Sequence, residues 1–213
     1  MNKVFRVDPE KPSAEVINLA ATVLRDGGIV VFPTETVYGI GAAAHSSFGP
    51  HEIADIKVYP PEKPLPWLVE DEDALGTYGV DVPAYAHRLA EAFWPGALTL
   101  VVRASDVVGK DFRADDGTVG LRSPDHRVVM DLIQASGGPI ITTSANTTGH
   151  PAPGDFAEVE ERIVAAADVA LDGGKTELRT PSTVVDCTGV EPRIIREGAI
   201  PADRIMAAAL KEA

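Results

Sequence analysis

The sequence has few of the residues that support disulfide or metal chemistry. It contains one cysteine, Cys187, so no disulfide can form within the chain. No group of Cys and His residues has the spacing of metal ligands, and we expect no protein metal site. The first residues lack the apolar core of a signal peptide, and no apolar run reaches the ~18–20 residues that cross a bilayer. These absences predict a cytoplasmic protein without a membrane anchor.

Basic residues are scarce as well. The chain has 19 Lys and Arg against 32 Asp and Glu, a formal net charge of −13. A field of this sign repels nucleic-acid phosphates at long range, which disfavours a general DNA- or RNA-coating role. A local basic pocket can still exist inside an acidic shell. The 213 residues are enough for one sizeable core, and we predict a single domain over residues 1–213.

The apolar pattern alternates between short runs and helical spacing, which predicts an α/β fold. Ser13 is the expected N-cap of the first helix, which Gly27 and Gly28 end. The Gly- and Pro-rich segments 147–155 and 172–181 are expected to be surface loops. Strands are predicted at 4–7, 29–32, 65–69, 97–102, 119–122, 139–143, 183–186 and 193–196, and helices at 16–24, 52–57, 85–93, 128–135, 156–167 and 202–210.

Candidate chemistry begins with two segments that precede or follow predicted strands. Ligands of α/β proteins usually sit beyond strand ends. The segment 33–39, Pro-Thr-Glu-Thr-Val-Tyr-Gly, can hold a small polar ligand, or it can be a turn whose hydroxyl groups satisfy the main chain. In the segment 57–65, Lys57 and Lys63 flank several prolines. Their ammonium groups can bind phosphate, but they can equally be ordinary surface lysines.

Two further segments add an arginine and a cluster of uncharged hydrogen-bonding groups. Arg122 ends a predicted strand, where it can clamp a carboxylate or phosphate or form a surface ion pair. Residues 142–146, Thr-Thr-Ser-Ala-Asn, carry four hydrogen-bonding side chains. A helix cap needs only one of them, so the excess favours binding. His126 and His150 lack a nearby Ser or Cys nucleophile, which argues against a hydrolytic triad.

In their order and spacing, these segments resemble the Sua5/YciO/YrdC family of threonylcarbamoyl-AMP synthases. The resemblance extends over nearly the whole chain, and the length is similar to the short, single-domain form. The matching stretches are GGIVVFPTETVYGIGA (27–42), the loop 57–65, FWPGALTLVV (93–102), TVGLRSPDH (118–126), TTSANTTG (142–149), STVVD (182–186) and IIREGAI (194–200).

The resemblance implies a twisted mixed sheet with flanking helices around a deep concave cavity. It also implies a reaction in which L-threonine, bicarbonate and ATP give threonylcarbamoyl-AMP and pyrophosphate, with Mg²⁺ accompanying ATP. A separate tRNA threonylcarbamoyl transferase complex then modifies adenosine 37, so weak contact with tRNA is a further expectation.

By the same resemblance, Thr36 and Arg122 would bind threonine, and Lys57, Ser144 and Asn146 would be catalytic. The ATP-binding residues would be Lys57, Tyr59, Lys63, Thr118, Ser144, Asn146, Ser182 and Arg196.

The chain departs from the family pattern at one position. The family reads Lys-x-Arg-Pro where this sequence reads Lys57-Val58-Tyr59-Pro60, so a neutral phenol replaces a cation, and Lys63 is the cation that can compensate. An alternative function is therefore a diverged relative that binds nucleotide or RNA. A carbamoyl-transfer domain of the kind found in hydrogenase-maturation proteins is also related, but those domains belong to much longer chains.

Overall fold

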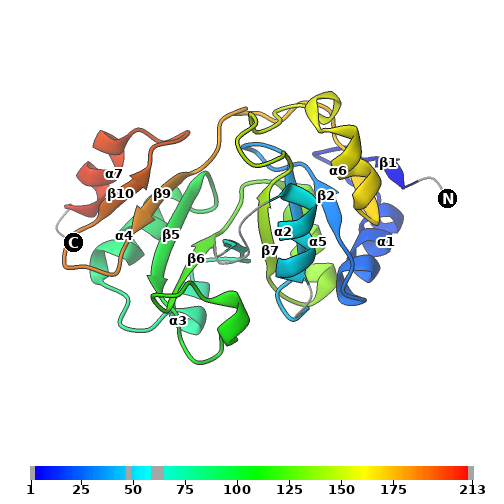
Figure 1. Cartoon of the computed structure of the whole chain (residues 1–213). Coiled ribbons are helices and arrows are strands. Elements are labelled where there is room, and N and C mark those ends of the chain that lie inside the picture. Colours follow the sequence, from blue (N-terminus) through cyan, green and yellow to red (C-terminus); the bar gives the residue numbers. More distant parts are fainter. Residues whose placement is uncertain (1–2, 47–48, 59–64, 211–213) are drawn as a thin grey trace.

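A twisted mixed sheet of ten strands runs through the residues described by this computed structural model, 3–46, 49–58 and 65–210 (Figure 1). The strand order is β1-β8-β2-β3-β7-β4-β6-β5-β9-β10. The strands are β1 (Val4–Arg6), β2 (Val30–Phe32), β3 (Gly39–Ala43), β4 (Trp67–Leu68), β5 (Leu98–Arg103), β6 (Thr118–Arg122), β7 (Ile140–Ser144), β8 (Val169–Asp172), β9 (Thr183–Asp186) and β10 (Arg193–Arg196).

Parallel and antiparallel pairs alternate irregularly across the sheet. Strands β1, β8 and β2 are parallel, as are β4 with β6 and β5 with β9, whereas the other neighbours are antiparallel. The helices are α1 (Ala14–Arg25), α2 (Gly49–Lys57), α3 (Ala74–Tyr78), α4 (Ala84–Phe93), α5 (Arg127–Ser136), α6 (Glu161–Ala166) and α7 (Ala202–Ala209). Among the described residues, no helix is long and apolar enough to span a membrane.

The sheet separates two hydrophobic cores. Successive residues of a strand point to opposite faces, and in β2 this places Val30 and Phe32 in one core and Val31 in the other. The first core also contains apolar residues of α1 and α5, which pack against each other. The second receives apolar residues from α2, α4, α6 and α7. Burying each large apolar side chain contributes about 1.5–3 kcal/mol to folding.

The predicted fold class and most predicted elements are confirmed, but β3, β8 and α3 were not predicted. Strand β3 has the sequence Gly-Ile-Gly-Ala-Ala, which lacks the β-branched runs typical of strands. A Cβ at Gly41 would lie 2.6 Å from Ile141 O and 3.0 Å from the Phe32 ring. Small residues are therefore needed here because they let Phe32 pack over the strand.

The helix predicted at 156–167 is confirmed only over Glu161–Ala166. The structure has a 3₁₀ turn at Phe156–Glu158, then extended main chain at Val159 and Glu160, and only then α6. Val159 is buried, while the Glu160 carboxylate accepts two hydrogen bonds from Thr147. These tertiary contacts override the helical pattern of the sequence. The predicted cap of the first helix is confirmed in position, because Ser13 is the N-cap of α1, but its side chain makes no capping hydrogen bond.

Candidate functional site

A cavity of about 480 Å³ lies over one face of the sheet. Its lining residues on β6 are Thr118, Gly120 and Arg122, which alternate along the strand, whereas Leu121 between them belongs to the core. Thr99 and Val101 of β5 alternate in the same way, whereas β7 contributes the consecutive residues Thr142, Thr143 and Ser144, and β9 contributes Val184. The apolar part of the lining consists of Val37, Pro66, Leu68, Val101, Pro181, Val184 and Ile195.

The loop after β2 presents Thr36 to this cavity. Thr34 Oγ1 accepts hydrogen bonds from the main-chain N–H groups of Thr36 (3.1 Å) and Val37 (3.2 Å) and donates one to Val37 O (2.7 Å). Such a threonine turn fixes the local main chain. Thr34 therefore satisfies the main chain, as one interpretation of the sequence expects, and Thr36 lines the cavity. Ligand binding by this loop stays a prediction.

Arg122 enters the cavity beside Thr36. Its Nη2 donates to Thr36 Oγ1 at 2.9 Å, and its Nε donates to Gly96 O at 3.1 Å. Nη2 also lies 2.7 Å from Glu35 Oε1, in an ion pair in which both side chains are buried. Three groups thus hold the guanidinium in one orientation.

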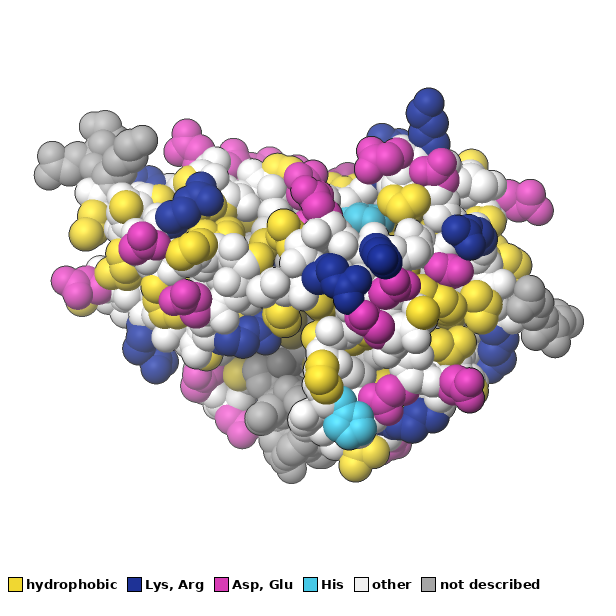
Figure 2. Space-filling view, turned by 90° about the horizontal axis from the view of Figure 1, so that it is seen from above, with side chains coloured by type: hydrophobic (Ala, Val, Ile, Leu, Met, Phe, Trp, Pro, Cys, Tyr) yellow, Lys and Arg dark blue, Asp and Glu magenta, His cyan; other side chains and the backbone are white. Residues whose placement is uncertain are grey.

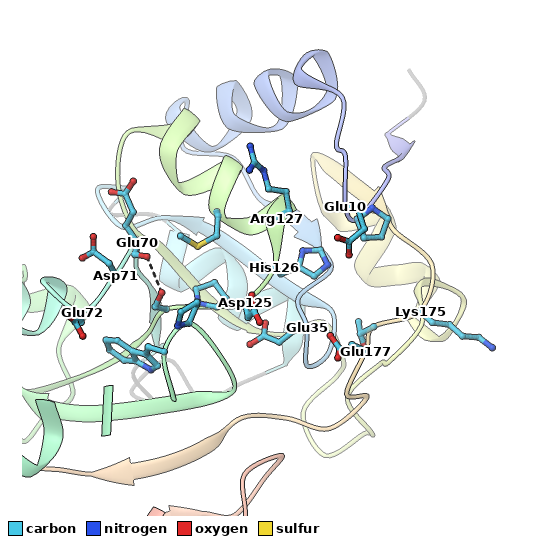
Figure 3. A pocket seen from close by; sticks show the side chains of 17 residues that line it. Glu10, Glu35, Glu70, Asp71, Glu72, Asp125, His126, Arg127, Lys175 and Glu177 are labelled. Carbon is cyan, nitrogen blue, oxygen red and sulfur yellow. Dashed lines mark hydrogen bonds between the residues drawn. The ribbon is translucent and has the colours of Figure 1, made fainter. Parts of the chain in front are cut away.

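Glu35 occupies the wall between two cavities. Arg122 lines the first cavity, and Glu35 lines a second, wider one of about 1110 Å³ (Figure 3). Burial lowers the pKa of His126, which lines the second cavity and is neutral at pH 7 as a result. The second cavity suits phosphate poorly, because its lining carries the carboxylates of Glu10, Glu35, Glu70, Asp71, Glu72, Asp125 and Glu177.

The Ser-Ala-Asn motif begins inside β7. The structure places Thr142, Thr143 and Ser144 in the strand, which thus ends one residue later than the predicted strand at 139–143. The reason is that β3 pairs along their whole length, up to Ser144 opposite Gly39. Ser144 lines the cavity, and Asn146 lies just beyond the end of the strand.

Lys57, at the end of α2, contacts the main chain of this motif. Its ammonium group donates to the carbonyl oxygens of Ser144 and Asn146, the latter at 2.7 Å. The side chain is only 2% exposed, and burial lowers the pKa of Lys57 to about 8. Asn146 Nδ2 donates to His150 O (2.8 Å), while its Oδ1 is buried and has no partner among the described residues.

Arg196 and the hydroxyl groups of Thr99 and Ser182 also line the cavity. Arg196 Nη2 donates to Ser182 O at 2.8 Å, and Ser182 Oγ lies 2.9 Å from Thr99 Oγ1. Burial, and secondarily the nearby Arg122, lower the pKa of Arg196, although a guanidinium remains charged at neutral pH. Thr118 Oγ1 donates to Asp116. Sequence reasoning missed Thr99, whose only signal is its place in the alternation of β5.

The structure thus brings most of the expected site residues to one cavity. Lys57 and Asn146 do not line it, although both contact the segment that does. Tyr59 and Lys63 lie outside the described residues. The expected residues that line the cavity are Thr36, Thr118, Arg122, Ser144, Ser182 and Arg196.

Comparison with known proteins agrees with this geometry. A family model for Sua5, YciO and YrdC, described as telomere recombination, matches residues 22–198. The chain belongs to the Sua5/YciO/YrdC family. A threonylcarbamoyl-AMP synthase of Pyrococcus abyssi is 37% identical over 89% of the chain, which spans 56% of that relative. A putative threonylcarbamoyl-AMP synthase of Mycobacterium tuberculosis is also 37% identical, over 93% of the chain and 90% of the relative.

Solved structures of this family have the same fold. Sua5 of P. abyssi in complex with L-threonine superposes with a TM-score of 0.92 at 35% identity, over 97% of this chain and 61% of that one. Escherichia coli YciO superposes with a TM-score of 0.87 at 26% identity, over 97% of this chain and 100% of that one. The chain therefore corresponds to about three fifths of Sua5 and to the whole of YciO.

Proposed function

We propose that this protein is an L-threonylcarbamoyladenylate synthase, a nucleotidyltransferase that makes threonylcarbamoyl-AMP and pyrophosphate from L-threonine, bicarbonate and ATP. The observation that carries the proposal is a single cavity that joins the Thr36–Arg122 pair to Ser144 and Arg196. The names of the two synthase relatives and the L-threonine bound to Sua5 support it.

Threonine would bind at the Thr36 and Arg122 end of the cavity. A guanidinium forms strong, charge-assisted hydrogen bonds with a carboxylate. Because Nε and Nη2 of Arg122 already donate to Gly96 O and Thr36 Oγ1, the carboxylate would bind through Nη1. The Glu35 carboxylate and Gly96 O hold the guanidinium in place before substrate arrives. This arrangement reduces the entropy that is lost when threonine binds.

ATP would lie across the sheet, with its base on the apolar lining and its phosphates towards Ser144 and Arg196. Val101, Val184 and Ile195 offer an apolar surface to a purine ring. Pockets of this kind, mostly apolar with a few placed polar groups, are typical of small-molecule sites. The hydroxyl groups of Thr118 and Ser182 would contact the nucleotide from the same wall.

The proposed reaction needs no protein nucleophile. The threonine amine combines with bicarbonate and releases water, or with carbon dioxide and releases a proton, to give a carbamate. A carbamate oxygen then attacks the α-phosphorus of ATP, and the bond from that phosphorus to the bridging oxygen breaks, so that pyrophosphate leaves. Catalysis would come from placing the reactants and from neutralising the charge that develops on phosphate oxygens. Lys57, Ser144 and Asn146 would supply this stabilisation, and for that Lys57 must share its ammonium group with a phosphate.

Mg²⁺ would enter with ATP as part of the substrate. Within the described ranges, no group of three or more His, Cys, Asp or Glu residues has metal-site geometry. Mg²⁺ bound to phosphates commonly takes only one or two protein oxygens. Asn146 Oδ1, which is buried and has no partner in the part of the chain that the structure describes, is a suitable oxygen.

We propose that the product passes to a tRNA threonylcarbamoyl transferase complex in the cytoplasm, and that contact of this chain with tRNA is weak. On the face shown in Figure 2, Lys and Arg side chains are interspersed with Asp and Glu. This distribution and the net charge of −13 favour small anionic ligands in a pocket over extended RNA binding.

A second function, nucleotide binding with little turnover, is favoured by Tyr59 in place of the family arginine. Pyrophosphate release from ATP separates the two functions. The synthase is expected to release pyrophosphate only when L-threonine and bicarbonate are both present. Omission of either should abolish release, and release that is indifferent to threonine would contradict the proposal. Binding of an ATP analogue without release would favour the second function.

A further inference from the structure

Glu160, which does not line the cavity, holds the segment that follows β7. Both oxygens of its carboxylate accept hydrogen bonds from Thr147, one from the main-chain N–H (2.7 Å) and one from Oγ1 (2.5 Å). His150 Nδ1 lies 3.2 Å from the same carboxylate. The two hydrogen bonds from Thr147 are the main reason that the pKa of Glu160 is lowered to about 2. Glu160 therefore stays ionised throughout the neutral range.

Arg162 and the end of α2 complete the clamp on this segment. Arg162 Nε donates to Thr147 Oγ1 (3.0 Å), and Arg162 Nη1 donates to Ile56 O (2.5 Å) on α2. Lys57 O accepts hydrogen bonds from both N–H and Oγ1 of Thr148, each at 3.1 Å. The segment is thus tied on one side to the residues that precede α6 and on the other to the last turn of α2.

The carboxylate of Glu160 is not used by its own helix. Glu160 occupies the N-cap position of α6, but its side chain makes no capping hydrogen bond there. Its main chain is extended, which interrupts the helical pattern and directs the carboxylate away from α6 to Thr147. A residue that served only the helix would bond the first N–H groups of α6 instead.

We infer that Glu160 is a positioning residue for the phosphate-binding part of the site. This inference rests on the proposed function. By holding Thr147, Glu160 fixes the position of the main chain next to Asn146. This in turn fixes the position of the Asn146 carbonyl group that Lys57 contacts. The Glu160 carboxylate also favours the charged form of Lys57, against the opposing influence of Arg162. Glu160 would therefore affect the binding of ATP and leave the threonine end of the cavity unchanged.

Two substitutions with matched controls test this role. Glu160→Gln removes the charge and one of the two acceptors, and Glu161→Gln changes the exposed neighbour on α6. Thr147→Val removes the hydroxyl group at nearly constant shape, and Thr147→Ser keeps it. In Glu160→Gln the amide hydrogens of Thr147 and Thr148 should exchange about tenfold faster than in wild type. In Glu161→Gln the same two amide hydrogens should exchange at the wild-type rate.

The kinetic result distinguishes positioning from a purely structural effect. Loss of a hydrogen bond to a charged group should raise KM for ATP about fivefold or more in Glu160→Gln, with KM for threonine unchanged. Thr147→Val should also raise KM for ATP, though less, and Thr147→Ser should leave it unchanged. A lower kcat with both KM values unchanged would indicate only fewer folded molecules and would overturn the inference.

A failure of the proposed function can be recognised separately. If the wild-type protein releases no pyrophosphate, the synthase proposal fails, and the inference is then decided by calorimetry with a non-hydrolysable ATP analogue. Weaker binding of the analogue to Glu160→Gln than to Glu161→Gln would support positioning of the phosphate site. Equal binding, or no binding to wild type, would overturn it.

Discussion

The ammonium group of Lys57 donates a hydrogen bond to the main-chain carbonyl of Ser144, a residue 87 positions later in the chain. This contact joins the end of α2 to the end of β7 at the edge of the cavity. Because a second hydrogen bond goes to Asn146 O, the cation sits between two carbonyl groups and is shielded from solvent. The phosphate that we propose for Lys57 would therefore have to compete with these carbonyl groups.

The pH dependence of ATP use should report the titration of Lys57. Burial lowers its pKa from 10.5 to about 8, so the free enzyme loses this cation as pH rises through about 8. We expect kcat/KM for ATP to fall over that range, because a neutral amine stabilises phosphate charge poorly. Lys57→Arg should remove this fall, since a guanidinium stays charged. An identical fall in the arginine variant would assign the titration to another group.

The ion pair between Arg122 and Glu35 predicts a non-additive double substitution. Arg122→Met leaves the Glu35 carboxylate buried without its cation, which should lower the free energy of unfolding by roughly 3–5 kcal/mol. Adding Glu35→Gln should recover much of that loss, because no buried charge remains. Neither variant should bind threonine, because both lack the Arg122 guanidinium. Urea unfolding and calorimetry measure the two effects, and a double variant no more stable than Arg122→Met would contradict the account.

Gly198 should tolerate no side chain. A Cβ there would collide with Pro181 O and lie 2.5 Å from Ser182 O, next to the cavity wall. Gly198→Ala should lower the free energy of unfolding by about 1–3 kcal/mol and weaken ATP binding through Ser182. Gly138→Ala is the control, because a Cβ at that position meets no atom within 4 Å. Equal stability of the two variants in urea unfolding would show that the main chain at Gly198 can move.

The parts of the fold that were predicted correctly have strong local signals. The short apolar run that ends at Arg122 predicts a strand at 119–122. The structure has this strand, and Arg122 at its end faces the cavity. Strand β3 escaped prediction because Gly39 and Gly41 lie close under the ring of Phe32, a contact that no local pattern reveals.

The parts of the site that escaped prediction depend on long-range contacts. The contact of Lys57 with main-chain carbonyl groups follows from how α2 packs against the sheet, and nothing in the segment 57–65 encodes it. Glu160 was hidden inside a helical pattern, because the contacts that interrupt the helix, among them its bond to Thr147 thirteen residues earlier, are tertiary. The expected roles of Tyr59 and Lys63 remain predictions.

The central claim is that one cavity holds a nucleotide beside an amino acid, and simultaneous binding tests it most directly. Calorimetry should show that L-threonine binds to protein already saturated with a non-hydrolysable ATP analogue. Arg196→Gln should weaken the binding of the analogue and leave the binding of threonine unchanged. Arg193 lies on the same strand but pairs with Asp186 at the surface, so Arg193→Gln should bind both ligands like wild type. Competition between the two ligands, or no heat when both are present, would contradict the account.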